Sequence, residues 1–199
     1  SYYPVGLLQK KGEGDSPEMY FGLISGSYKN NTQGGVLRAK IGKISDEVNK
    51  TTGQFKTRDG STNGAGVIST LNKLKITGFG WDQYSCGWIT NRAINNGECS
   101  AWGNPIGEML YESLRYFAGA KTPSTEFTVG TGDELSLPED SWNDPFAADG
   151  GFAYCAKPFN LVISDVGTSY DSDQVPGSAF SNYKGLLPSG MSGLNVSDW

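Results

Sequence analysis

Asn104 and Asp165 carry side-chain oxygens that could bind a metal ion, and their places in the sequence favour such a site. Asn104 precedes a helix-forming run, and Asp165 ends the apolar run 159–164. In an open α/β sheet, strand ends and helix starts meet in one crevice, where ligands bind. Carboxylate and amide oxygens are ligands of Ca²⁺ and Mg²⁺, so this pair is the first candidate metal site. Simpler interpretations stay open: Asn104 can be a helix N-cap, and Asp165 can cap a turn.

A second acidic pair, Asp171 and Asp173, follows a few residues later. The spacing resembles half of an EF-hand loop, without its glycine and its closing glutamate. A solvated loop is the alternative interpretation.

The chain has no histidine. Histidine-based acid–base catalysis, Ser-His-Asp and Cys-His nucleophiles and histidine-ligated zinc are therefore excluded. No C-x-x-C pair and no glycine-rich phosphate-binding motif occurs either. The groups that remain are oxygen ligands and aromatic side chains, which favour a binding module rather than an enzyme.

Cys86 and Cys99 flank a short polar loop, which predicts a disulfide and an oxidising, exported compartment. Two reduced thiols near a turn are the alternative. Cys155 is then left over, either buried or paired with a cysteine outside the chain.

Aromatic residues crowd the region of this loop and form a candidate surface patch: Trp81, Trp88 and Trp102. They suit a sugar or protein surface, or they anchor the loop. With nearby carboxylates they support an alternative function, an extracellular carbohydrate-binding or carbohydrate-active protein. The carboxylates considered for it are Asp82, Glu98, Glu108 and Glu112. Glu108 and Glu112 share a helix face, which rarely gives the separation across a cleft that a retaining glycosidase needs.

Composition limits the partners. The 199 residues carry a net charge of −5 and no basic stripe, so nucleic acid is an unsuitable partner. No apolar run reaches the roughly 20 residues of a membrane helix, so no membrane insertion is expected. Because the chain starts without Met or a leader, we expect either a removed signal or a piece of a longer protein.

Hydrophobic patterns supply the elements that must position these residues. They predict strands at 19–25 and 159–164, each an apolar run typical of a strand covered on both faces, and a hairpin or edge strand at 35–41. A short amphipathic helix is expected from Val67, ending near Gly78. The clearest helix is 105–118, capped by Asn104 and followed by Gly119. Its expected inner face is Ile106, Met109, Leu110, Leu114 and Phe117. Strands 19–25 and 159–164 should neighbour each other in one mostly parallel sheet, with this helix packed on it.

Three long motifs occur in order: 35–38, 102–119, and 157–165 with 169–178. Together they resemble the amino-terminal region of the PilY/PilC family, large bacterial type IV pilus biogenesis factors and tip adhesins. The resemblance covers about residues 4–178 and implies an exported fragment of a larger protein. Its location would be the bacterial cell surface, the pilus tip or the outer membrane, and its partners would be minor pilins and a host or surface ligand. The function implied is non-catalytic adhesion or pilus assembly.

That region of the family looks like a von Willebrand factor A domain, an open doubly wound α/β sheet with a metal-dependent adhesion site. The resemblance implies such a domain over 1–180, with loop insertions around 79–102 and 121–154, and with 181–199 as surface wrap or the start of another module. Asn104 stands where the family pattern has Thr, and Asp165 where it has its late Asp. No Asp-x-Ser-x-Ser ends an apolar run. We therefore expect no cofactor in this segment, and Ca²⁺ or Mg²⁺ only with residues of the full-length protein.

Overall fold

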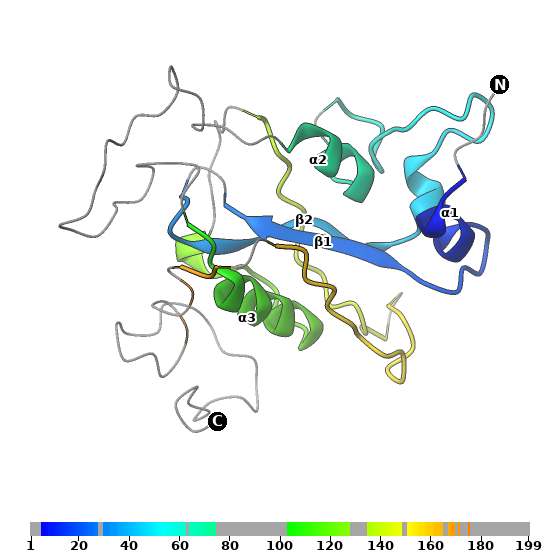
Figure 1. Cartoon of the computed structure of the whole chain (residues 1–199). Helices are drawn as coiled ribbons and strands as arrows, with labels where there is room; N and C mark the ends of the chain where they lie inside the picture. The colour runs from blue at the N-terminus through cyan, green and yellow to red at the C-terminus, as the bar shows by residue number, and fades with distance from the viewer. Residues whose placement is uncertain are drawn as a thin grey trace, which may run out of the picture. The chain divides into compact units, whose positions relative to one another are not determined.

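The structure is a computed structural model that describes residues 5–27, 30–62, 64–74, 103–127, 135–148, 151–164, 167–169, 171 and 175. Its elements are α1 (Leu7–Gly12), β1 (Phe21–Gly26), β2 (Gly34–Gly42), the 3-10 turn η1 (Ile44–Glu47), α2 (Val67–Lys73), α3 (Ile106–Phe117) and the 3-10 turn η2 (Thr125–Phe127) (Figure 1). β1 and β2 form a two-stranded antiparallel sheet, which confirms the hairpin interpretation of 35–41. Among the described helices, none has the length and apolar character needed to cross a membrane.

The chain divides into two compact units. The first comprises residues 1–24, 37–74 and 134–141, and the second comprises 25–36, 75–133 and 142–199. Both strands run through the boundary, so each unit holds a part of β1 and of β2.

The core of the first unit is small and apolar. Ala39 of β2, Ile44 of η1 and Val67 of α2 are buried, and partly buried apolar side chains pack around them: Leu8, Phe21, Leu23 and Ile68. α1 approaches this core so closely that a Cβ on Gly12 would lie 2.7 Å from the Phe21 ring. The helix predicted from Val67 is confirmed, although it ends at Lys73 rather than near Gly78.

A buried carboxylate braces the start of α2. Glu47 is fully buried and accepts hydrogen bonds from the backbone N–H groups of Val67 (2.9 Å) and Ile68 (2.7 Å). Its carboxylate also pairs with Arg58 Nε at 2.8 Å, and Arg58 donates to the carbonyl of Phe21 at 3.0 Å. The Glu47–Arg58 ion pair therefore connects η1, α2 and β1. The Glu47 carboxylate also bonds the first N–H groups of α2, which have no side-chain cap from the residue before the helix.

The segment 136–141 covers an edge of β2. The Asp140 N–H donates to the Leu37 carbonyl (2.8 Å), and its carboxylate accepts from the Lys40 N–H (2.8 Å). Arg38 Nη1 donates to the Pro138 carbonyl at 3.1 Å. Main-chain groups that an edge strand would expose are thus satisfied without a third regular strand.

In the second unit, α3 buries a face that the sequence did not predict. The expected inner face was apolar, yet Leu114 is half exposed and the buried positions are Glu108, Tyr111, Glu112, Ser113, Arg115 and Tyr116. The prediction of an apolar inner face is wrong because the charged side chains find partners inside the unit. The helix itself is confirmed: Gly119 follows it with φ +82°, and the Gly119 and Ala120 N–H groups bond back to Tyr116 and Arg115.

The segment 159–164 is not a buried strand. It follows an extended course (Figure 1), pairs with no strand among the described residues, and exposes Phe159, Leu161 and Ile163. The prediction that it neighbours 19–25 in a parallel sheet is therefore wrong for the described part of the chain. An apolar run becomes a buried strand only where neighbouring chain covers it.

Candidate functional site

The amino end of α3 gathers several of the residues singled out in the sequence. Asn104 forms a two-way backbone bridge with Ser169, with both N–H to O distances at 3.2 Å. Its side-chain Nδ2 donates to Ser164 Oγ (2.9 Å) and to the Gly167 carbonyl (2.8 Å). Residues on both sides of Asp165 therefore contact Asn104, whereas Asp165 itself lies outside the described residues, so the predicted Asn104–Asp165 pair stays a prediction.

Asp171, rather than Asn104, serves as the cap of α3. The helix begins at Ile106, and Pro105 at the cap position makes no side-chain cap bond. The Asp171 carboxylate accepts from the Gly107 N–H in the first turn. A carboxylate there is favoured by the unpaired N–H groups and the helix dipole. The predicted Asn104 cap is wrong, because its side-chain amide is bonded to Ser164 and Gly167 instead.

Most of the other predicted site residues lie outside the described part of the chain. These are Asp165, Asp173, the pair Cys86 and Cys99, and the aromatic residues Trp81, Trp88 and Trp102. Cys155 is described and is an exposed free cysteine, so of its two predicted alternatives burial is wrong, and pairing with a cysteine outside the chain stays a prediction.

The described residues at the amino end of α3 do not fit a divalent metal. Ser164 Oγ lies 3.2 Å from Asn104 Oδ1 and donates to it, and the amide nitrogen is bonded twice. The Asp171 carboxylate is bonded to a helix N–H. Within the described ranges, no group of three or more His, Cys, Asp or Glu side chains could hold a metal ion. Ca²⁺ takes six to eight oxygens, so these ligands are too few.

A buried charged cluster lies on α3 and was missed by the sequence analysis. Glu112 and Arg115 are fully buried and form an ion pair of 2.5 Å. The Glu112 carboxylate also accepts from the Ser124 N–H (3.0 Å) and Oγ (2.5 Å). The Arg115 guanidinium lies 5.4 Å from the centre of the Trp142 ring, in cation–π range.

Glu108, one turn earlier on α3, is also fully buried, and its carboxylate accepts from the Gly34 N–H at 3.0 Å. Glu108 and Glu112 therefore bond to protein groups instead of facing each other across a cleft, which contradicts their proposed role as a carboxylate pair. The signal available in the sequence was the i, i+4, i+7 spacing of Glu108, Glu112 and Arg115, a pattern that usually marks a solvated helix face.

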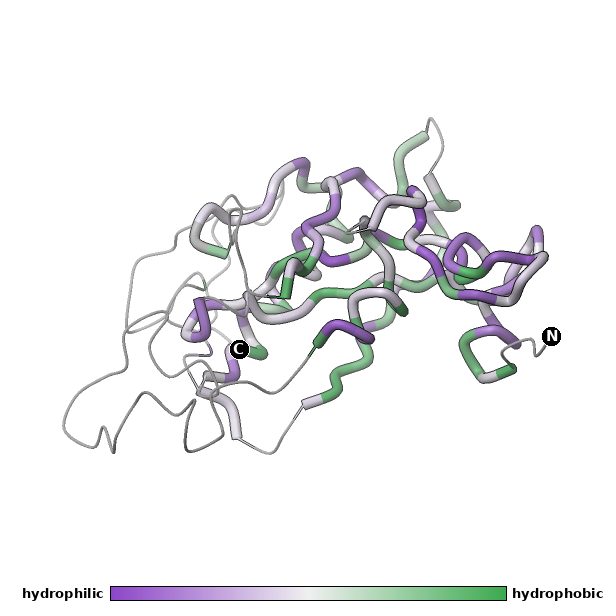
Figure 2. The backbone as a smooth tube through the Cα atoms, turned by 90° about the horizontal axis from the view of Figure 1, so that it is seen from above, coloured by the Kyte–Doolittle hydropathy of each residue, from purple (hydrophilic) through white to green (hydrophobic). Residues whose placement is uncertain are grey.

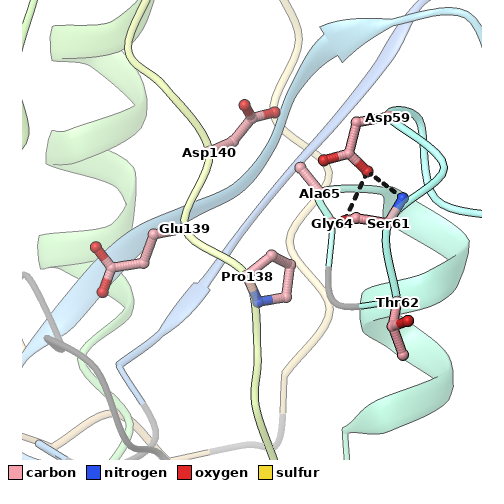
Figure 3. Close-up of a pocket in the computed structure, with 8 residues that line it drawn as sticks. All are labelled: Asp59, Ser61, Thr62, Gly64, Ala65, Pro138, Glu139 and Asp140. Carbon is pink, nitrogen blue, oxygen red and sulfur yellow. Dashed lines mark hydrogen bonds between the residues drawn. The ribbon is translucent and has the colours of Figure 1, made fainter.

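A polar cavity of about 510 Å³ lies in the first unit. Figure 3 shows its lining, which comes from the loop before α2 and from the segment 138–140: Asp59, Ser61, Thr62, Gly64, Ala65, Pro138, Glu139 and Asp140. The Asp59 carboxylate accepts hydrogen bonds from the Ser61 backbone N–H and from the Ser61 hydroxyl, both at 2.9 Å. These bonds, the backbone one more strongly, lower the pKa of Asp59 from the usual 3.8. None of these lining residues is aromatic, so the cavity offers no stacking surface for a sugar ring.

Comparison with known proteins identifies the family. The family model described as "PilY1 homolog, second domain" matches residues 21–199. The chain belongs to this family. A type IV pilus biogenesis factor PilY1 homolog of Xylella fastidiosa strain Temecula1 is 39% identical over 211 residues, covering 99% of this chain. The chain spans 14% of the length of that relative. No solved structure matches the chain.

The family resemblance read from the motifs at 35–38, 102–119 and 157–178 is thereby confirmed for this PilY1-related chain. Its likeness to a von Willebrand factor A domain is a finer statement and stays a prediction.

Proposed function

We propose that this PilY1-related chain is a non-catalytic module of an exported factor that acts in type IV pilus biogenesis at the bacterial surface. The observation that carries the proposal is the match over nearly the whole chain to a relative named for that role. The buried carboxylates support a scaffold, since Glu47, Glu108 and Glu112 each bond to backbone N–H groups. Minor pilins and a host or surface ligand are the proposed partners.

The von Willebrand factor A-like sheet is part of the same proposal. It is supported by the contacts of Ser164, Gly167 and Ser169 with Asn104 at the amino end of α3. An adhesion-type metal site would then need oxygen ligands from outside this segment. Isothermal calorimetry of the segment with Ca²⁺ and Mg²⁺ should detect no micromolar binding. A micromolar affinity that Asp165→Ala abolishes would contradict this expectation.

The biogenesis role can be separated from adhesion in the producing bacterium. An in-frame deletion of the segment should reduce the pilin sheared from the cell surface while total cellular pilin is unchanged. A strain carrying Glu18→Gln, which alters only an exposed ion pair with Lys11, is the matched control. Normal surface pili with lost attachment would assign the segment to adhesion instead, and no change in either would refute the proposal.

A further inference from the structure

The segment 159–164 has two different faces. Two of its even-numbered residues are tethered within the second unit, because Ser113 Oγ of α3 donates to Asn160 Oδ1 (2.6 Å) and Asn104 Nδ2 donates to Ser164 Oγ (2.9 Å). Alternate side chains of an extended chain point to opposite sides. The segment therefore has one side tethered to Asn104 and Ser113 and one side turned away from them.

The opposite face is apolar and uncovered. Phe159, Leu161 and Ile163 are 78%, 86% and 89% exposed, and the apolar run can be followed in hydropathy colouring (Figure 2). Single exposed apolar residues are ordinary, but three large ones on one face of one extended segment mark an interaction surface.

The backbone of the segment is also unpaired within the described part of the chain. No backbone hydrogen bond joins Phe159, Leu161, Val162 or Ile163 to another described residue. Pro158 stands at the start, a position where a strand tolerates proline. β-Branched residues, an extended backbone and free N–H and C=O groups together fit the addition of a neighbouring strand.

We propose that residues 159–163 form a docking strand, and that its partner is a β-strand from the part of the longer polypeptide outside these 199 residues. The chain spans 14% of its relative, so most of such a polypeptide lies elsewhere. A strand in the same polypeptide binds at high effective concentration, which favours it over a second copy or a separate protein. The partner strand pairs with the free backbone groups, and apolar side chains beside it cover Phe159, Leu161 and Ile163.

Hydrogen exchange on the full-length polypeptide tests whether the strand is paired. The amides of Leu161, Val162 and Ile163 should exchange roughly 100-fold or more slower than in an unstructured chain, because paired strands open with free energies well above zero. Fast exchange at these amides, with slow exchange retained in α3, would overturn the proposal.

Photo-crosslinking identifies the partner. Benzoylphenylalanine is placed at Phe159 in the full-length polypeptide, and at Phe55, which is 52% exposed in the other unit, as the control. Phe159 should crosslink to a peptide of the same polypeptide outside the 199 residues, in higher yield than Phe55. Crosslinks confined to the 199 residues, to an isotope-labelled second copy or to another protein would overturn it, as would failure to crosslink outside the segment.

Discussion

The buried ion pair of α3 gives the sharpest test of what stabilises this chain. Glu112→Gln keeps the shape of the side chain and an acceptor for Ser124, but it removes the charge that faces Arg115. Because both partners are fully buried, Arg115 would be left with an uncompensated charge. Breaking a buried pair in this way costs about 3–5 kcal/mol, and the free energy of unfolding should fall by that amount.

An exposed pair of nearly the same length serves as the control. Lys11 and Glu18 lie 2.6 Å apart, with side chains 45% and 68% exposed. Exposed pairs contribute about 0–1 kcal/mol, so Glu18→Gln should change little. The two ion pairs have nearly equal lengths but differ in burial, so comparing the two variants separates the effect of burial from that of contact.

Urea denaturation followed by far-ultraviolet circular dichroism measures both variants. The single variant Arg115→Met and the double variant Glu112→Gln/Arg115→Met complete the double-mutant cycle. Removing both charges should restore part of the lost stability, because the double variant no longer leaves an uncompensated charge in the interior. The reasoning is refuted if Glu112→Gln and Glu18→Gln cost the same, or if the double variant is less stable than Glu112→Gln.

Three further changes have expected outcomes. Asn104→Asp should cost about 0.5–1.5 kcal/mol, because a carboxylate cannot make the two exposed donor bonds of the amide; urea midpoints measure it, and an unchanged midpoint would contradict the bonding described. Gly35→Ala should destabilise by more than about 1 kcal/mol, since φ is +114° there and the space is filled, whereas Gly26→Ala, with nothing within 4 Å, should not. The lowered pKa of Asp59 means that its contribution is present above pH 3.8 and is lost as the pH falls through the folded-state value. Asp59→Asn should remove that acid-dependent loss in urea midpoints measured from pH 5 downward, and an identical pH profile would contradict it.

Local patterns were enough to place α2, α3 and the two strands of the hairpin, whereas α1 (Leu7–Gly12) was not predicted. The runs around Phe21, Gly35, Val67 and Ile106 carry periodicities that short-range geometry fixes, and the elements begin within a few residues of the predicted bounds. The end of α3 was equally readable, since Gly119 adopts a backbone conformation that other residues avoid.

The features that the sequence did not predict depend on contacts with residues far away in the chain. Glu108 is buried because Gly34, 74 positions away, donates to it. Asn104 fails to cap α3 because Ser164, 60 positions away, bonds its amide. The apolar run at 159–164 predicted a covered strand, but periodicity does not say which chain supplies the cover. Pairings of this kind depend on the closed fold and leave no mark in the local sequence.

The coverage of β2 by Asp140 has a consequence for how fragments of this protein behave. One residue occupies the donor and acceptor positions next to Leu37 and Lys40 that a foreign strand would otherwise fill. A shortened chain that ends before residue 134 would uncover those groups on a strand whose first six residues are buried in the intact fold. Such a fragment should self-associate through this edge. Insolubility of early-terminated products would then result from the loss of the segment 136–141 that covers β2, and not from a failure of the hairpin to form.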